Sequence, residues 1–470
     1  MGQQMIQELP KSGRVATGLE RRISALAAAV LALLALEGCG GGGGGSNPMA
    51  DACSDGPRKA WLRSYMDDWY FWTALSPKPS PDGNSSLNAY FDALRYTGTD
   101  PNFPADRWSY RSDTDQFSRF FSAGETLGYG LMVAGVEVAG NASAPLYLRY
   151  VEPQSPAALA GLSRGDRLIN VNGNPVSTLI ASNDFSPLSP GAAGDLLRLT
   201  VRRTGVADRD LSLTAAVYAL TPVTGTRVVN SPAGRKLGYL MVKDMVTQAQ
   251  SPYDLAMAQF STAQVDDVVI DLRYNGGGLV STAALLSSYV AASRTAGQLF
   301  THLSFNSAHA AASNTNFGFS NPSSALRLPR VYVLTGPRTC SASELLVNGL
   351  RPFIEVVTIG ATSCGKPVGF QSTADTCGST WSVVNFESTN ASGVGRYFDG
   401  LPATCKVTED FNQTLGSRTE PLLAEAIKHA DTGACSSLAA GPVTAQSVQR
   451  APRLAVTDEP AGRGGMVLGR

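Results

Sequence analysis

The stretch Arg338–Leu350, RTCSASELLVNGL, places a serine where a helix is expected to begin. Ser341 and Glu344 have the S-x-x-E spacing of a capping box, in which the serine caps the helix and the glutamate reaches back. The free amides and the dipole of a helix start also favour developing negative charge, which suits a nucleophile. A histidine base is not close in sequence, because the only histidines of the chain are His302, His309 and His429.

Two further short stretches have residues suited to chemistry. Asn275–Leu279, NGGGL, directly follows a strand-like run, and glycines there let the backbone point amides at a substrate, as an oxyanion hole requires. Lys366 lies in SCGKPVGF, after the strand-like run EVVTIG. A lysine acts as a base only if burial or a neighbouring cation lowers its pKa until it is neutral near pH 7.

Composition excludes some classes of function. The chain has 38 basic and 38 acidic residues among 470, so no field of one sign supports nucleic-acid binding. Seven cysteines occur; setting Cys39 aside leaves six, which permit disulfides in an exported chain and allow about fifteen pairings that sequence does not rank. The lack of a CxxC pair and the scarcity of histidine argue against a zinc site.

The N-terminal residues have the pattern of an export signal. Arg21 and Arg22 precede the apolar run Ile23–Leu36, which is too short for a comfortable transmembrane helix and suits a signal-peptide core. The run leads to Cys39, in a context that resembles a bacterial lipoprotein cleavage box, and then to six glycines, Gly40–Gly45. We expect a lipid anchor at Cys39 with a flexible tether, a plain secretory signal being the alternative.

The residue pattern of the rest of the chain changes from one segment to the next. Helical periodicity with many aromatic residues gives way to short strands and turns, then to alternating strands and helices, which predict a sheet with parallel segments. The predicted segments are a signal peptide (1–38), a Gly-rich tether (39–50), a helical N-terminal domain (51–115), a β-rich domain (116–217), a catalytic domain (218–435) and a disordered tail (436–470).

The β-rich region resembles a PDZ domain. The resemblance rests on Ser155–Ala158, Gly161–Leu162, Gly165–Asp166 and the turn Asn172–Gly173. It implies that an upstream loop grips a peptide carboxylate with its amides while the peptide adds a strand to the sheet edge. The residues that match this loop are Gly128, Tyr129, Gly130 and Leu131.

The order of PDZ pattern, DLRYNGGG, SASE and then GK resembles the C-terminal processing (tail-specific) serine proteases. That family uses a Ser–Lys dyad, and the resemblance implies Ser341 as the nucleophile and Lys366 as the general base. By the same match Glu344 is a carboxylate that orients the site. The residues that match the oxyanion hole are Ala342, Gly277 and Gly278. Where some members have an aspartate eleven residues after the nucleophile, this chain has Pro352.

The resemblance implies a multidomain α+β fold with a helical N-terminal segment, a β-rich PDZ domain and an α/β (crotonase-like) catalytic body. The expected function is an exported, periplasm-facing serine endopeptidase of the cell envelope that recognises polypeptide C-termini and works through an acyl-enzyme, with neither cofactor nor metal. One competing hypothesis is a catalytically inert PDZ-containing peptide-binding scaffold of the cell envelope, and another is a periplasmic ligand-binding protein. If Lys366 is not the base, His302 or His309 is the candidate in its place.

Overall fold

The computed structural model describes residues 52–135, 137–436 and 465–469. The predicted signal peptide, the tether and the lipidation site Cys39 lie outside these residues. Among the described residues, no helix combines the length and the apolar character that a membrane crossing requires.

The N-terminal segment is helical and shares its core with later strands. Helix α3 begins after Ser86, whose Oγ accepts from the Ala89 N–H at 3.1 Å, and it buries apolar residues at i, i+3, i+4 and i+7. These side chains join an aromatic cluster that includes Phe370 and Trp381, far along the chain. The bounds are α2 Asp55–Trp69, η1 Pro81–Gly83, α3 Leu87–Leu94, β1 Tyr110–Asp113, α4 Thr114–Ser118 and η2 Arg119–Ala123.

The region with the PDZ pattern is an antiparallel sheet with a hydrophobic core of its own. Ser155 caps α5 as the sequence predicts, and Asn172 and Gly173 both have positive φ in the tight turn between β5 and β6. The strand order is β3-β4-β5-β7-β8, with β6 on β5. The bounds are β3 Leu131–Val133, β4 Leu146–Val151, α5 Pro156–Leu159, β5 Arg167–Val171, β6 Asn174–Pro175, α6 Val176–Ser182, η3 Ser186–Leu188, β7 Leu196–Arg202 and β8 Arg209–Thr214. Strands β2 Glu125–Gly128 and β9 Ala216–Ala219 form a separate antiparallel pair at its two ends.

The α/β body contains a mostly parallel sheet in the order β10-β11-β12-β16-β17-β22. Only β10 is antiparallel to its neighbour, and β12 and β16 consist of near-continuous apolar runs, as expected of parallel strands covered on both faces. The strands are β10 Val223–Asn230, β11 Lys236–Val242, β12 Asp267–Asp271, β16 Arg330–Thr335, β17 Glu355–Gly360 and β22 Cys405–Lys406. The helices of the body are η4 Thr247–Ala249, α7 Gln250–Ala263, α8 Val280–Val290, α9 Ala292–Thr295, α10 Ala310–Ser313, α11 Ala342–Leu350 and α12 Pro421–Thr432.

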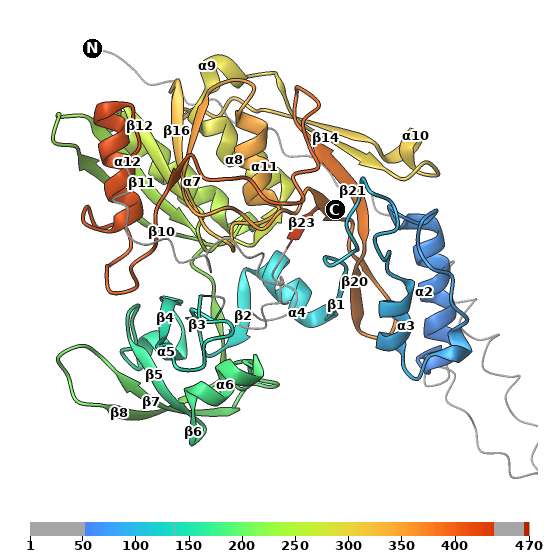
Figure 1. The fold of residues 1–470 in the computed structure, drawn as a ribbon. Coiled ribbons are helices and arrows are strands. Elements are labelled where there is room, and N and C mark those ends of the chain that lie inside the picture. Colours follow the sequence, from blue (N-terminus) through green and yellow to red (C-terminus); the bar gives the residue numbers. More distant parts are fainter. Residues whose placement is uncertain (1–51, 136, 437–464, 470) are drawn as a thin grey trace, which may run out of the picture. The chain divides into compact units, whose positions relative to one another are not determined.

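A second sheet lies on the other side of α8 and α11, and the largest hydrophobic cluster fills the space between the two sheets (Figure 1). Its order is β13-β23-β18-β21-β14-β15. The strands are β13 Gly277–Leu279, β14 Leu299–Phe305, β15 Thr315–Gly318, β18 Val368–Phe370, β21 Val384–Thr389 and β23 Gly465–Val467. A small sheet, β1-β20-β19, joins the N-terminal segment to β19 Thr373–Ala374 and β20 Ser379–Ser382.

Strand β23 corrects one prediction. The sequence predicts a disordered tail over 436–470, and this is wrong for residues 465–469, whose first three residues form a strand between β13 and β18 of the second sheet. Met466 and Val467 are 0% and 4% exposed. A three-residue strand has no detectable period, and its stability comes from partners about 100 and 190 residues earlier in the chain.

Three disulfides select one pairing of the six cysteines, Cys53–Cys377, Cys340–Cys364 and Cys405–Cys435. The first joins the start of the helical segment to the small sheet, and the third joins β22 to the end of α12. The second lies beside Ser341, where it bears on the candidate site.

Candidate active site

Ser341 lies in a strained turn between β16 and α11. Its backbone has φ 62° and ψ −112°, which is uncommon for a residue with a side chain and is often found at functional sites. The expected capping box is present: Glu344 accepts from the Ser341 N–H at 2.8 Å, and the Ser341 side chain faces the backbone N–H of Glu344. The contact of the Ser341 Oγ with that amide is longer than a regular hydrogen bond, so this buried hydroxyl is only weakly engaged as a helix cap.

Lys366 is buried close to this turn. Its side chain belongs to a residue that is 4% exposed, and its Nζ lies 4.0 Å from the centroid of the Phe370 ring. Burial lowers the pKa of Lys366 to about 7, although the charges of Asp106 and Glu344 act in the opposite direction. A substantial fraction of the amine is therefore neutral near pH 7, which a general base requires.

Glu344 connects the two segments that hold Ser341 and Lys366. One oxygen, Oε2, accepts from the N–H groups of both residues at 2.8 Å. The other, Oε1, accepts from the Gly365 N–H at 2.7 Å and the Ser363 Oγ at 2.5 Å. Burial raises the pKa of the Glu344 carboxyl above its ordinary value, opposed by these four donors. Glu344 thus positions the backbone on both sides of the site.

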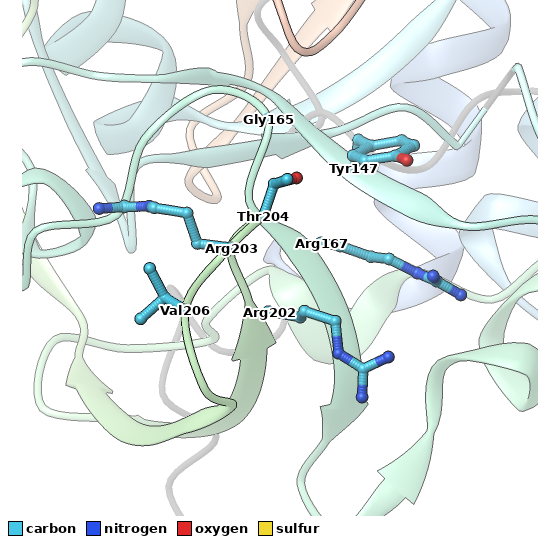
Figure 2. Close-up of a pocket in the computed structure, with 8 residues that line it drawn as sticks. Tyr147, Gly165, Arg167, Arg202, Arg203, Thr204 and Val206 are labelled. Atoms are coloured by element: carbon cyan, nitrogen blue, oxygen red, sulfur yellow. The ribbon is translucent and has the colours of Figure 1, made fainter.

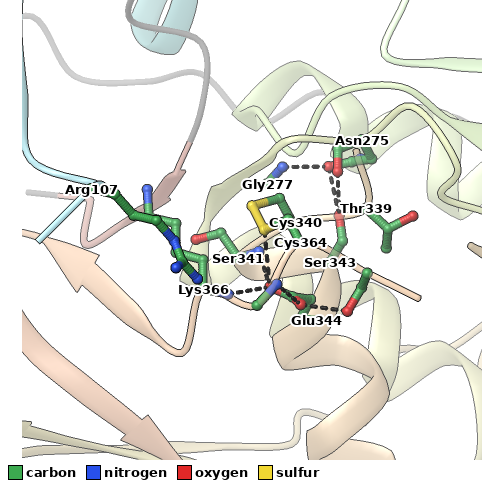
Figure 3. The surroundings of a disulfide bond; sticks show 12 residues. Arg107, Asn275, Gly277, Thr339, Cys340, Ser341, Ser343, Glu344, Cys364 and Lys366 are labelled. Atoms are coloured by element: carbon green, nitrogen blue, oxygen red, sulfur yellow. Dashed lines mark hydrogen bonds between the residues drawn. A yellow bond between two sulfur atoms is a disulfide. The ribbon is translucent and has the colours of Figure 1, made fainter. Parts of the chain in front are cut away.

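A disulfide reinforces the same junction. Cys340 precedes Ser341, and its partner Cys364 lies two residues before Lys366. The Cys364 N–H also donates to the Thr339 carbonyl at 3.0 Å, so the two loops are joined by backbone as well as by sulfur. Figure 3 shows the disulfide among Ser341, Glu344 and Lys366.

The glycines predicted for the oxyanion hole differ in what their amides do. The Gly277 N–H donates to Asn275 Oδ1 at 2.8 Å and is occupied within the turn. Met245 bonds to the flanking residues, donating to the Gly277 carbonyl and accepting from the Leu279 N–H. Since strand residues alternate in direction, the Gly278 N–H faces the opposite side, where β23 lies. The Ala342 N–H is in the first turn of α11, where amides lack intrahelical partners.

Asn275 and Asp106 also contribute to the site, although the sequence analysis gave neither residue a role of its own. Asn275 bonds Ser343 through Oδ1 at 2.8 Å, and its carbonyl accepts from the Cys340 N–H, so it ties the glycine turn to the start of α11. Its only sequence signal is its place before the glycines. Asp106 is buried, accepts from the Tyr70 hydroxyl at 2.7 Å and acts on Lys366 from the N-terminal segment. No local pattern marks it.

The two histidines proposed as candidate bases in place of Lys366 have partners of their own. His302 Nδ1 lies 2.6 Å from Asn316 Oδ1 on the neighbouring strand. His309 stacks on Trp69 and its Nε2 lies 2.9 Å from Asp68. Neither contact involves Ser341, so these contacts give no support to a histidine base.

The predicted peptide loop, Gly128–Leu131, leads into the edge strand β3. The Tyr129 and Gly130 carbonyls accept from Ala157 and Glu152 N–H groups, at 2.9 and 2.8 Å. Gly130 has φ 82°, and a Cβ there would lie 1.9 Å from that of Ser155, so the turn requires glycine. Glu137, which follows β3 in the chain, pairs at 2.8 Å with Arg338 of the loop before Ser341.

A pocket of about 280 Å³ lies elsewhere in the PDZ region, between Tyr147, Gly165 and the turn after β7 (Figure 2). Two of its three arginines have acidic partners in the same region: Arg202 pairs with Asp208, and Arg203 with Asp166. It contains none of the residues predicted for catalysis or peptide binding.

Comparison with known families gives three matches. Residues 236–395 match peptidase family S41, residues 58–110 match the peptidase S41 N-terminal domain, and residues 147–203 match a PDZ domain. The first of these ranges contains the candidate nucleophile, the base and the glycine turn.

Curated relatives and a solved structure agree with these matches. A chloroplastic carboxyl-terminal-processing peptidase 1 of Arabidopsis thaliana is 27% identical over 65% of this chain and 62% of its own. A chloroplastic C-terminal processing peptidase of Tetradesmus obliquus is 27% identical over 35% of this chain, and the match spans 39% of that relative. A crystal structure of a putative S41 protease from Bacteroides fragilis superposes with TM-score 0.63 and 26% identity, covering 80% of this chain and 97% of that one.

The matches agree with the architecture, since each family model falls on the segment whose fold it describes. The predicted combination of helical N-terminal segment, PDZ domain and α/β peptidase body is confirmed. Residues 236–395 therefore form a peptidase family S41 domain, residues 147–203 form a PDZ domain, and the chain is homologous to the carboxyl-terminal processing proteases.

Proposed function

We propose that this chain is an exported serine endopeptidase that cleaves proteins recognised through their C-terminal tails by means of a Ser341–Lys366 dyad. The observation that carries the proposal is the burial of Lys366, which lowers its pKa to about 7, in a loop held beside Ser341 by Glu344. A buried lysine with no pairing role would be a costly feature in a hydrophobic body, whereas a base needs that environment.

The reaction follows from these groups. Neutral Lys366 takes the Ser341 proton as Oγ attacks the peptide carbonyl, and the ammonium then protonates the leaving amine. The Ala342 and Gly278 amides are the donors for the tetrahedral oxyanion, each worth about a hundred- to a thousandfold in rate. Water then attacks the acyl-enzyme carbonyl while Lys366 accepts a proton from it. The C–O bond to Ser341 breaks, the Lys366 ammonium returns the proton to the Ser341 oxygen, and the carboxyl product leaves.

The PDZ domain supports substrate selection by tails. Strand β3 is at the edge of its sheet, so a peptide could add to it as a further strand after the Gly128–Leu131 loop. Three disulfides support export, since such bonds persist in oxidising compartments. Anchoring through a lipidated Cys39, facing the periplasm, rests on the sequence alone.

The test is proteolysis of a labelled, unstructured polypeptide with varied C-terminal residues, by the purified protein without residues 1–38. We expect Ser341→Ala and Lys366→Ala each to lower turnover by about a thousandfold or more. Lys406→Ala is the matched control, because Lys406 is exposed. Activity surviving in Lys366→Ala excludes the dyad, and tail binding without turnover by the unaltered protein identifies a peptide-binding scaffold instead.

Recognition by the PDZ domain has a separate test. Gly130→Ala is expected to abolish the dependence of cleavage on the C-terminal residues, because its Cβ would clash with Ser155. Gly173→Ala is the control, since that glycine also has positive φ but has no neighbouring atom within 4 Å of the added carbon. Equal tail dependence in both variants would contradict recognition through this loop.

A further inference from the structure

The segment Gly465–Gly469 lies between the two strands that flank the candidate active site. Strand β23 is parallel to β13 on one side, with Gly278 opposite Met466, and parallel to β18 on the other, with Gly369 opposite Met466. The Leu468 N–H continues the pairing by donating to the Phe370 carbonyl at 2.9 Å. Without this segment, the facing edges of β13 and β18 would lack a strand partner. The segment thus completes the sheet between the glycine turn and the lysine loop.

Both flanking strands belong to the catalytic machinery. Strand β13 contains Gly278, whose N–H faces the segment, and β18 begins two residues after Lys366. A substrate whose carbonyl is to reach the Gly278 amide must approach this same edge of β13. The segment therefore occupies backbone hydrogen-bonding positions that an extended substrate chain would use.

The side chains of the segment show what the position accepts. Met466 packs in the cluster around α8 and α11, and Val467 packs on the other face with Leu279 and Phe370. Within the described part of the chain, residues 465–469 make neither an ion pair nor a disulfide, so backbone bonds and apolar contacts hold the segment. The position takes an extended, uncharged segment with apolar residues on both faces.

The nucleophile is covered in this arrangement. Ser341 is 0% exposed and Lys366 is 4% exposed. Both side chains are therefore shielded from solvent in this form, which we call the closed form.

We propose that residues 465–469 are a pseudosubstrate, which fills the strand position between β13 and β18 and leaves when a polypeptide segment of similar apolar character binds there. The consequence that displacement of the segment activates cleavage rests on the proposed function. Recognition of the apolar strand itself is independent of turnover. Substrates are thereby selected twice. The PDZ domain selects their C-terminal tails, and this strand position selects an uncharged, extended segment at the scissile bond.

The activity test uses Met466→Asp combined with Val467→Asp, which places charges at two buried positions. Gly469→Asp is the control, because it adds charge to an exposed position of the same segment. If the closed form makes up about 90% of the protein, its loss lowers KM about tenfold with kcat little changed. A KM of the double variant that is no lower than the KM of the Gly469→Asp control overturns the proposal.

The binding test separates this proposal from the proposed function. In a Ser341→Ala background, a labelled peptide with the sequence GMVLG should bind the double variant at least about tenfold more tightly than the protein with its own segment intact. Binding in fluorescence anisotropy with no turnover in any variant that retains Ser341 supports the strand site and contradicts the protease. Turnover without peptide binding contradicts the pseudosubstrate and leaves the protease standing.

A measurement without substitutions in the segment guards against a variant that does not fold. In the full-length Ser341→Ala protein, hydrogen exchange at the amides of Met466, Val467 and Leu468 should accelerate when excess GMVLG peptide is added. Unchanged exchange at a saturating peptide concentration shows that the segment is a permanent strand of the sheet and overturns the proposal.

Discussion

Ser341 and Lys366 donate their backbone N–H groups to the same oxygen atom, Oε2 of Glu344, each at 2.8 Å. The two residues belong to different loops of the chain. This one carboxylate holds the two loops in place relative to each other. The relationship makes Glu344 a positioning residue and leads to the first prediction.

Glu344→Gln should lower both stability and kcat, because an amide nitrogen would face N–H donors in place of one carboxylate oxygen. Leaving buried donors unpaired costs about 1–3 kcal/mol. Urea unfolding and turnover measure the two effects, and KM should change less than kcat. Glu355→Gln is the control, because Glu355 is exposed. Equal kcat in both variants would show that Glu344 does not position the dyad.

Activity should rise with pH through about 7, since burial lowers the pKa of Lys366 to about that value and only the neutral amine accepts the serine proton. Stability changes in the same direction. Between about pH 7 and the ordinary lysine pKa near 10.5, the unfolded state binds more protons at this group, so the free energy of unfolding rises with pH. Lys366→Met should remove this part of the pH dependence in urea titrations at about pH 7, 8 and 9. A parallel profile in the variant would contradict the lowered pKa.

Asp106→Asn should move the acid limb of the rate profile to lower pH. The Asp106 charge raises the pKa of Lys366 against burial, and removing the charge leaves burial less opposed. The pH dependence of kcat/KM measures the shift. Asp92→Asn, at an exposed position paired with Arg95, is the control and should leave the limb in place. A shift to higher pH would show that Asp106 acts on the site in another way.

Removing the Cys340–Cys364 disulfide by substituting both cysteines with serine should lower stability and kcat together. The sequence separation of 24 residues accounts for about 3 kcal/mol in the chain-entropy model. The Cys405–Cys435 pair, with a separation of 30 residues, is the matched control, which should lose similar stability and retain kcat. Thermal unfolding and turnover distinguish the outcomes, and equal kcat losses would assign the disulfide no special role at the site.

Gly278→Ala should lower both turnover and stability. Its φ is 140°, and an added Cβ would lie 2.2 Å from the Met245 carbonyl oxygen, so the strand that presents the Gly278 amide must shift. Loss of one oxyanion donor predicts a fall in kcat of about a hundredfold or more. Gly297→Ala is the control for positive φ alone, with no neighbouring atom within 4 Å of the added carbon. Full activity in Gly278→Ala would exclude this amide from the oxyanion hole.

Local signals explain what could be predicted. The helix start at Ser341, the turn at Asn172–Gly173 and the cap at Ser155 depend on residues within a few positions of each other, and the structure has each of them. The order of these motifs along the chain was enough to indicate the peptidase family, which the comparisons confirm. The roles of Ser341, Lys366 and the glycines remain predictions, with geometry that supports them.

The sequence by itself determined the nucleophile candidate, the glycine turn, the PDZ pattern and the place of Lys366 after the strand-like run EVVTIG. Only the tertiary structure decided the burial of Lys366, the influence of Asp106, the choice among the disulfide pairings and the place of residues 465–469. Each of these depends on segments that are distant in the chain. Desolvation, charge–charge interaction and strand pairing act through space, so no short stretch of sequence contains them.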